Sequence, residues 1–171
     1  SEPQLQLRLP TERYYEEEGR AELTPRDFGI LMHRVFENAA TTDEIYMAIE
    51  AMTQDGVLDE KEAPRLRELV EKALADPVTA EWFGGRWQVV RNENEIILPG
   101  SGTTRRPDRV MTDGERAVVV DYKFGDRETA RHRKQIREYL RLLRQMGYTR
   151  TEGYLWYVRL GRTERVEEKE D

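Results

Sequence analysis

A turn signal with apolar residues on both sides constrains this chain more than any other feature. Asp113-Gly114 is the dipeptide that most strongly favours a tight β-hairpin, and it lies between Val110-Met111 and Ala117–Val120. Folding the two strands back on each other brings Asp108, which precedes the first strand, near Asp121, which ends the second. The sequence therefore predicts a hairpin with two carboxylates meeting at one end.

The residues around the second aspartate predict a metal site. Lys123 follows Asp121 by two residues, so strand alternation places both side chains on one face of the sheet. Asp121 comes after an apolar run, where a charge is costly without a partner. Magnesium prefers oxygen ligands, and Lys123 could position or help deprotonate an attacking water, so this pattern suits phosphodiester hydrolysis. The simpler alternatives are a solvated Asp108 and a salt bridge from Lys123 to either aspartate.

Composition narrows the classes of protein that fit. The 171 residues, with 37% hydrophobic and 36% charged, fit one domain with a substantial core. The absence of cysteine excludes disulfides, zinc–thiolate sites and iron–sulfur clusters, and it fits a reducing cytoplasmic setting. No apolar run approaches the roughly 18 residues of a membrane span, so no membrane partner is expected. The net charge of −6 argues against nucleic acid, yet residues 101–150 hold 13 Lys and Arg against 7 Asp and Glu.

Apolar periodicity predicts a helical N-terminal half followed by strands. Helices are expected to begin at Thr24, Thr41, Asp59 and Asp76, with a long one over residues 128–146. Strands are expected at residues 87–90, at 95–98, in the hairpin and at 154–158. We assign residues 1–23 to a linker-like arm, 24–162 to the domain, with 43–84 as a helical insertion, and 163–171 to a frayed charged tail.

Several polar residues outside the hairpin are further candidates. His33 lies beside the apolar stripe of the first helix, where a packed histidine is the commoner explanation, and Glu37 follows one turn later. Glu93 and Glu95 alternate in an expected strand, either as a third acid or as edge charges that block aggregation. Gln135 and Tyr139 share a helix face at a spacing of four, although Tyr139 also fits the apolar stripe.

Taken in order, these motifs resemble the RecB-like nucleases of the PD-(D/E)xK superfamily, as in nuclease domains fused to UvrD-like helicases and in exodeoxyribonuclease V-type enzymes. The resemblance covers about Phe28 to Val158. It rests on Gly-Ile-Leu-Met-His at 29–33, Arg-Pro-Asp at 106–108, Asp-Tyr-Lys at 121–123 and Gln-Ile-Arg-Glu-Tyr at 135–139. One departure is Arg106, where the family often has glycine.

The resemblance implies a fold and a role for each residue. The fold would be α/β (α+β-like), with a restriction-endonuclease-like core in which a mixed sheet is flanked by helices. The metal ligands would be His33, Asp108, Asp121 and the carbonyl of Tyr122. The other site residues would be Lys123 in catalysis, Glu93 or alternatively Glu95 as the strand glutamate, and Gln135 and Tyr139 organising the DNA or the site.

The same resemblance implies a function. It favours a Mg²⁺- or Mn²⁺-dependent deoxyribonuclease, an exonuclease rather than an endonuclease, acting on single-stranded DNA in repair or recombination. Such domains usually follow a helicase motor. No Walker A pattern occurs here and the chain begins with Ser, so we expect a fragment whose motor lies elsewhere on the parent polypeptide. The alternatives are a catalytically inactive DNA-binding or assembly module, and an acidic interaction domain in which His33, Asp108 and Asp121 lie far apart.

Overall fold

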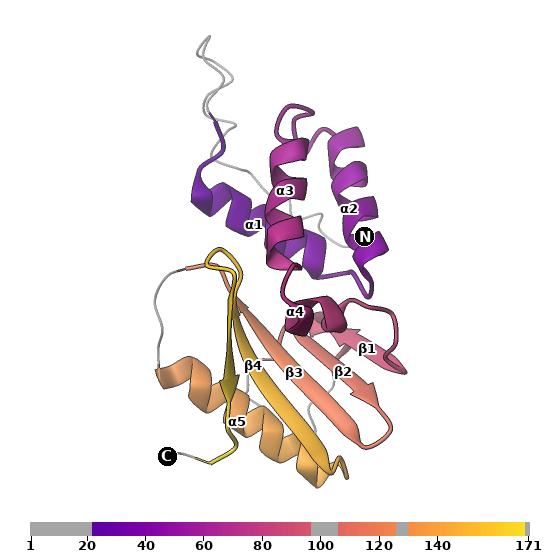
Figure 1. Cartoon of the computed structure of the whole chain (residues 1–171), viewed down its shortest axis with the longest axis vertical. Coiled ribbons are helices and arrows are strands. Elements are labelled where there is room, and N and C mark those ends of the chain that lie inside the picture. Colours follow the sequence, from indigo (N-terminus) through magenta and orange to yellow (C-terminus); the bar gives the residue numbers. More distant parts are fainter. Residues whose placement is uncertain (1–21, 97–105, 126–129, 170–171) are drawn as a thin grey trace.

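A computed structural model describes residues 22–96, 106–125 and 130–169, with helices first and a sheet after them (Figure 1). The helices of the first part are α1 (Pro25–Phe36), α2 (Thr42–Gln54), α3 (Ala63–Ala73) and α4 (Pro77–Trp82). The second part contains β1 (Val89–Asn92), the 3₁₀-helix η2 (Glu93–Glu95), β2 (Arg109–Asp113), β3 (Arg116–Lys123), α5 (Ala130–Gln145), β4 (Arg150–Tyr157) and β5 (Arg162–Val166). None of the helices in these ranges is long and apolar enough to span a bilayer.

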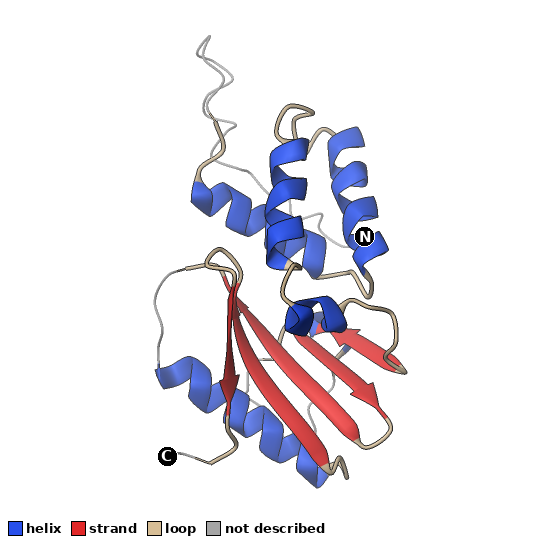
Figure 2. Ribbon diagram, viewed as in Figure 1, coloured by secondary structure: helices blue, strands red, loops and turns tan. Residues whose placement is uncertain are grey.

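The five strands form one mixed sheet in the order β1-β2-β3-β4-β5 (Figure 2). Neighbouring strands are antiparallel except β3 and β4, which are parallel and joined through α5. In the hairpin Asp113 pairs with Arg116, and Gly114 opens the two-residue loop with a φ of 59°, a conformation that glycine adopts without strain. The predicted hairpin and the predicted mixed sheet flanked by helices are both confirmed.

The two strands expected before the hairpin are only partly correct. A single strand, β1, covers Val89–Asn92 and pairs with β2. The chain then turns into η2, where the Glu95 carboxylate accepts a hydrogen bond from the Asn92 N–H at 3.2 Å. The expectation that Glu93 and Glu95 alternate on a strand face is therefore wrong, because a local side-chain cap competes with strand pairing. Residues 97–98 of the expected strand lie outside the described residues.

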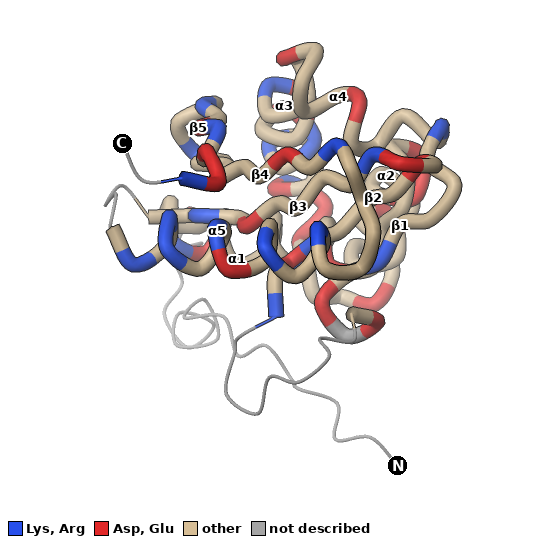
Figure 3. The backbone as a smooth tube through the Cα atoms, turned by 90° about the horizontal axis from the view of Figure 1, so that it is seen from below, with Lys and Arg blue, Asp and Glu red and all other residues tan. Residues whose placement is uncertain are grey.

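The expectation of a frayed tail after Arg162 is wrong for residues 163–166. These residues belong to β5, which pairs with β4 from Tyr157↔Arg162 onward. The strand lies beside the basic helix α5 (Figure 3), and Arg133 donates two hydrogen bonds to Glu164 at 2.5 and 3.2 Å. Backbone pairing and this bidentate ion pair thus order a segment that hydropathy alone describes as solvated.

The other expected boundaries differ by a few residues. Helix α3 begins at Ala63 rather than near Asp59, and α5 accounts for residues 130–145 of the expected long helix. Residues 128–129 of that helix and residues 1–21 of the expected linker-like arm lie outside the described residues. The assignment of residues 43–84 as an insertion stays a prediction.

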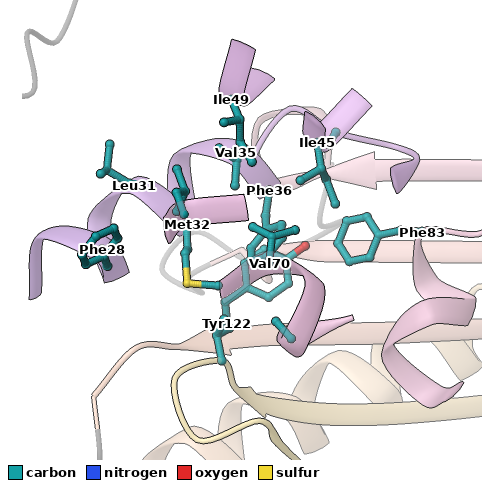
Figure 4. Packing of buried hydrophobic residues seen from close by; sticks show 14 of the residues in the cluster. Phe28, Leu31, Met32, Val35, Phe36, Ile45, Ile49, Val70, Phe83 and Tyr122 are labelled. Carbon is teal, nitrogen blue, oxygen red and sulfur yellow. The ribbon is translucent and has the colours of Figure 1, made fainter. Parts of the chain in front are cut away.

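Hydrophobic packing covers both faces of the sheet. On one face, the predicted stripe of α1 is buried among side chains of α2, α3 and β3 (Figure 4). On the other face, α5 packs Ile136, Tyr139 and Leu140 against β3 and β4. Gly153 permits this approach, since a Cβ there would lie 2.4 Å from a methyl carbon of Ile136.

A buried arginine joins the helical layer to the sheet. Arg109, the first residue of β2, is 0% exposed, and its guanidinium lies 4.0 Å from the centre of the Phe83 ring. The guanidinium donates to the carbonyls of Ala39 at 2.5 Å, Ala40 at 2.7 Å and Trp82 at 2.6 Å. Arg109 therefore ties the α1–α2 loop and the end of α4 to the strand that follows Asp108.

Replacing Arg109 by methionine is expected to lower the free energy of unfolding by about 3 kcal/mol or more. The three backbone carbonyls that accept hydrogen bonds from Arg109 would lose a charged donor. The free energy of unfolding from urea titrations measures this. Arg91→Met on β1 is the matched control, since Arg91 is exposed, and it should change stability by no more than about 0.5 kcal/mol. Equal losses in the two variants would contradict this role for Arg109.

Candidate metal centre

An imidazole and two carboxylates converge at the end of the sheet where β2 begins. His33 comes from α1, Glu93 from η2 and Asp108 from the residue before β2, and each offers one ligand atom within 4.8 Å of the other two. His33 Nε2 lies 3.6 Å from Asp108 Oδ1. Residues separated by up to 75 positions in the sequence thus form one group of the kind that holds a divalent cation.

Asp108 is held at the centre of this group by the end of β3. Its backbone N–H donates to Asp121 Oδ1 at 3.1 Å, and its own Oδ2 accepts from the Tyr122 N–H at 2.7 Å. Backbone pairing of the hairpin stops at Arg109↔Val120, so these side-chain bonds continue the ladder beyond its last paired residues. The predicted proximity of Asp108 and Asp121 is confirmed.

His33 is oriented by contacts on both sides of its ring. Its edge meets the rings of Tyr122 and Phe124, with centroids 6.4 and 5.8 Å away. Nδ1 lies 3.7 Å from Glu37 Oε2, which leaves Nε2 facing Asp108. The hydrogen bond to Asp108 raises the pKa of His33 above its usual 6.5, against the opposing effect of burial. His33 therefore contacts the acidic group as predicted, and its role as a metal ligand stays a prediction.

The side chain of Tyr122 lies in the core, and its backbone faces the candidate site. Its ring packs against Phe36 and Trp156, at 5.7 and 5.6 Å between centroids, and burial raises the pKa of its hydroxyl. The N–H and C=O of a strand residue point to the same side, and the Tyr122 N–H points to Asp108. The Tyr122 carbonyl therefore faces the Asp108 side of β3, and its role as a backbone ligand, which the resemblance implies, stays a prediction.

Asp121 and Lys123 lie on the opposite face of β3, which α5 covers. The two side chains are 2% and 9% exposed, a degree of burial that charged groups tolerate only with partners. On α5, Tyr139 is buried in the core, and Gln135 is half-buried one turn closer to the end of β3. The structure thus puts all four residues on one side of the sheet, and their catalytic roles stay predictions.

Glu93 is the residue whose position sequence reasoning described least well. The resemblance predicts a catalytic strand glutamate at this position, whereas Glu93 lies in a 3₁₀ turn within ligand distance of His33 and Asp108. The register explains this, because Asn92 pairs with Arg109 in an antiparallel ladder. The residue after β1 and the residue before β2 must then lie at the same end of the sheet. Pairing β1 with the hairpin in the sequence would have placed Glu93 beside Asp108.

The donor set fits a hard divalent cation. The group contains one imidazole and the carboxylates of Glu93 and Asp108. Asp121 and the Tyr122 carbonyl lie next to it, so the available ligands are mainly oxygen atoms. Asp108 is 5% exposed, so its charge needs compensation, and a bound cation would supply it. The arrangement can therefore hold a metal at this end of the sheet.

One family model matches nearly the whole chain. The family model described as the PD-(D/E)XK nuclease superfamily matches residues 4–171. A search of curated proteins found no match. The matched region includes the whole sheet, all the helices and the candidate metal centre.

The raised pKa of His33 predicts that metal binding weakens as the pH falls through a value above 6.5. A proton on Nε2 takes the lone pair through which a metal would bind, and Asp108 stabilises this protonated form. Titration calorimetry with Mn²⁺ across this pH range should show the loss of affinity in the wild type. The His33→Asn variant should bind more weakly, with a flatter pH profile.

The matched control is His132→Asn on α5, which should keep the pH profile of the wild type. If the His33→Asn variant keeps the pH profile of the wild type, the loss of affinity comes from protonation of another group, and the prediction is contradicted.

Proposed function

Because the chain belongs to the PD-(D/E)XK nuclease superfamily, whose nucleases use divalent metals and cleave DNA, we propose that it is a Mg²⁺- or Mn²⁺-dependent deoxyribonuclease. The observation that carries the proposal is the convergence of His33, Glu93 and Asp108 within 4.8 Å, with Asp121 bonded to the Asp108 backbone. A surface cluster of unrelated acids would need neither the buried aspartates nor the oriented imidazole.

The proposed ligands are His33, Asp108, Asp121 and the Tyr122 carbonyl, with Glu93 available to the same ion or to its water. A divalent ion held there would polarise the scissile phosphate and offset the negative charge that builds on it. In the hydrolysis, a water oxygen forms a bond to phosphorus while the bond to the leaving sugar oxygen breaks. The water gives up one proton and the leaving oxygen takes one up.

Lys123 is the group we assign to the attacking water. Its amine is confined by burial on the same strand face as Asp121, so little entropy is lost in positioning it. There Lys123 Nζ would orient the water or stabilise charge on the phosphate oxygens. Gln135 and Tyr139 would support the DNA strand or the site from α5, as the resemblance implies.

We propose single-stranded DNA as the substrate and an exonuclease mode of cleavage. Both rest on the likeness to RecB-like nucleases and on a basic helix beside the site. Two arginines of this helix form ion pairs within the protein, Arg133 with Glu164 and Arg144 with Glu168. The exposed basic side chains left as candidates for phosphate contacts are Arg131, Lys134 and Arg141.

We further propose that the chain is the nuclease module of a helicase–nuclease in DNA repair or recombination, working in the cytoplasm with a motor on the same parent polypeptide. The second candidate is a catalytically inactive DNA-binding or assembly module of the same fold. The complete set of family residues, from His33 to Tyr139, favours the enzyme.

Cleavage of labelled linear single-stranded DNA should require Mg²⁺ or Mn²⁺ and should stop in EDTA. Asp121→Asn and Lys123→Met should each lower the rate at least roughly a hundredfold, because each removes a charge aligned with the reaction. The controls are Asp113→Asn at the exposed end of β2 and Lys61→Met before α3, which should keep the wild-type rate.

A circular single strand distinguishes the cleavage modes. An exonuclease leaves a covalently closed circle intact, whereas its cleavage would identify an endonuclease. A wild type that binds Mn²⁺ and DNA yet cleaves neither form would support the inactive module.

A further inference from the structure

We propose that a pocket beside the metal centre binds one unstacked nucleotide of the substrate strand, next to the phosphate that is cleaved. The inference rests on the proposed nuclease function and specifies how that site holds its strand. The pocket, of about 480 Å³, lies between α1 and the end of β3 and is lined by Phe124, His33 and three arginines. Its volume falls within the range of about 300–1,000 Å³ that is usual for small-ligand sites.

Phe124 supplies a fixed aromatic surface in this pocket. It directly follows Lys123 and is half-buried, so part of the ring is accessible. The ring meets His33 edge-on at 5.8 Å with an interplanar angle of 77°. One turn earlier on α1, a Cβ on Gly29 would lie only 3.2 Å from Phe124 Cβ. Glycine therefore lets α1 approach Phe124 closely, and the helix holds the ring in place before any ligand arrives.

The charged side chains that line the pocket favour a phosphate. Arg26 and Arg34 reach it from α1 and Arg159 from the turn after β4. One carboxylate, Glu37, also lines the pocket, and it lies 3.7 Å from His33 Nδ1. The cations thus outnumber the acid, and guanidinium groups bind phosphate oxygens with charge-assisted hydrogen bonds. An aromatic face beside arginines matches a nucleotide, which carries a flat base and a phosphate.

The position of His33 connects the pocket to the chemistry. The same imidazole forms a wall of the pocket and belongs to the candidate metal group with Glu93 and Asp108. A nucleotide in the pocket would therefore be adjacent to a phosphate at the metal centre. Stacking on Phe124 requires a base that is not paired and stacked in a duplex, so the pocket selects single strands by the cost of unpairing.

The test is the binding of a short single-stranded oligonucleotide that contains 2-aminopurine, measured in EDTA so that no cleavage occurs. Wild type should quench the base fluorescence, and Phe124→Leu should weaken binding by about 5- to 100-fold through loss of one stacking contact. Phe124→Trp should restore affinity and quenching. Arg34→Ala should weaken binding and lower the salt dependence by about one phosphate contact.

The control is Arg150→Ala, because Arg150 is exposed at the opposite end of β4 and should not contact the strand. Unchanged affinity and quenching in Phe124→Leu would overturn the pocket proposal, while cleavage by the same proteins in Mg²⁺ would leave the nuclease proposal standing. A wild type that neither binds nor cleaves single strands would overturn both. Mn²⁺ titration of Phe124→Leu separates loss of stacking from damage to His33.

Discussion

The site depends on the point where hairpin pairing ends, at the buried Asp108 and at Arg109, the buried residue that begins β2. Asp108 bonds to both Asp121 and the Tyr122 N–H, so the strand that carries the candidate ligands cannot shift relative to its neighbour. Arg109, the next residue, bonds to three carbonyls of the helical layer. Two consecutive residues thus connect a candidate metal ligand to the scaffold that positions α1. The helices are thereby held at the distance at which His33 reaches Asp108.

This arrangement also explains how the protein tolerates its own negative charge. Asp108 and Asp121 are buried side by side, and Glu93 adds a third carboxylate at the same sheet end. Acids this close repel unless a positive group is present. A proton on His33, whose pKa Asp108 raises, offsets part of that charge, and a divalent cation would replace the proton on binding. The same repulsion between carboxylates therefore favours metal binding and lowers local stability when no positive group is present.

Local signals in the sequence predict part of the fold, and contacts between distant segments determine the rest. The hairpin, the apolar stripe of α1 and the meeting of Asp108 with Asp121 follow from turn chemistry and periodicity, which are properties of neighbouring residues. The 3₁₀ turn at Glu93 and strand β5 do not, because a side-chain cap and pairing with β4 and Arg133 decide them. The role of Arg109 is equally hidden, since its acceptors lie 69 or 70 residues earlier and 27 residues earlier in the chain.

The central claim is that one divalent ion binds where α1, η2 and the hairpin meet. A crystal soaked in Mn²⁺, with diffraction recorded at the manganese edge, tests it most directly. The account predicts one strong anomalous peak within coordination distance, about 2.0–2.6 Å, of His33 Nε2 and an Asp108 oxygen. A peak elsewhere, or none in crystals at saturating Mn²⁺, would contradict the account.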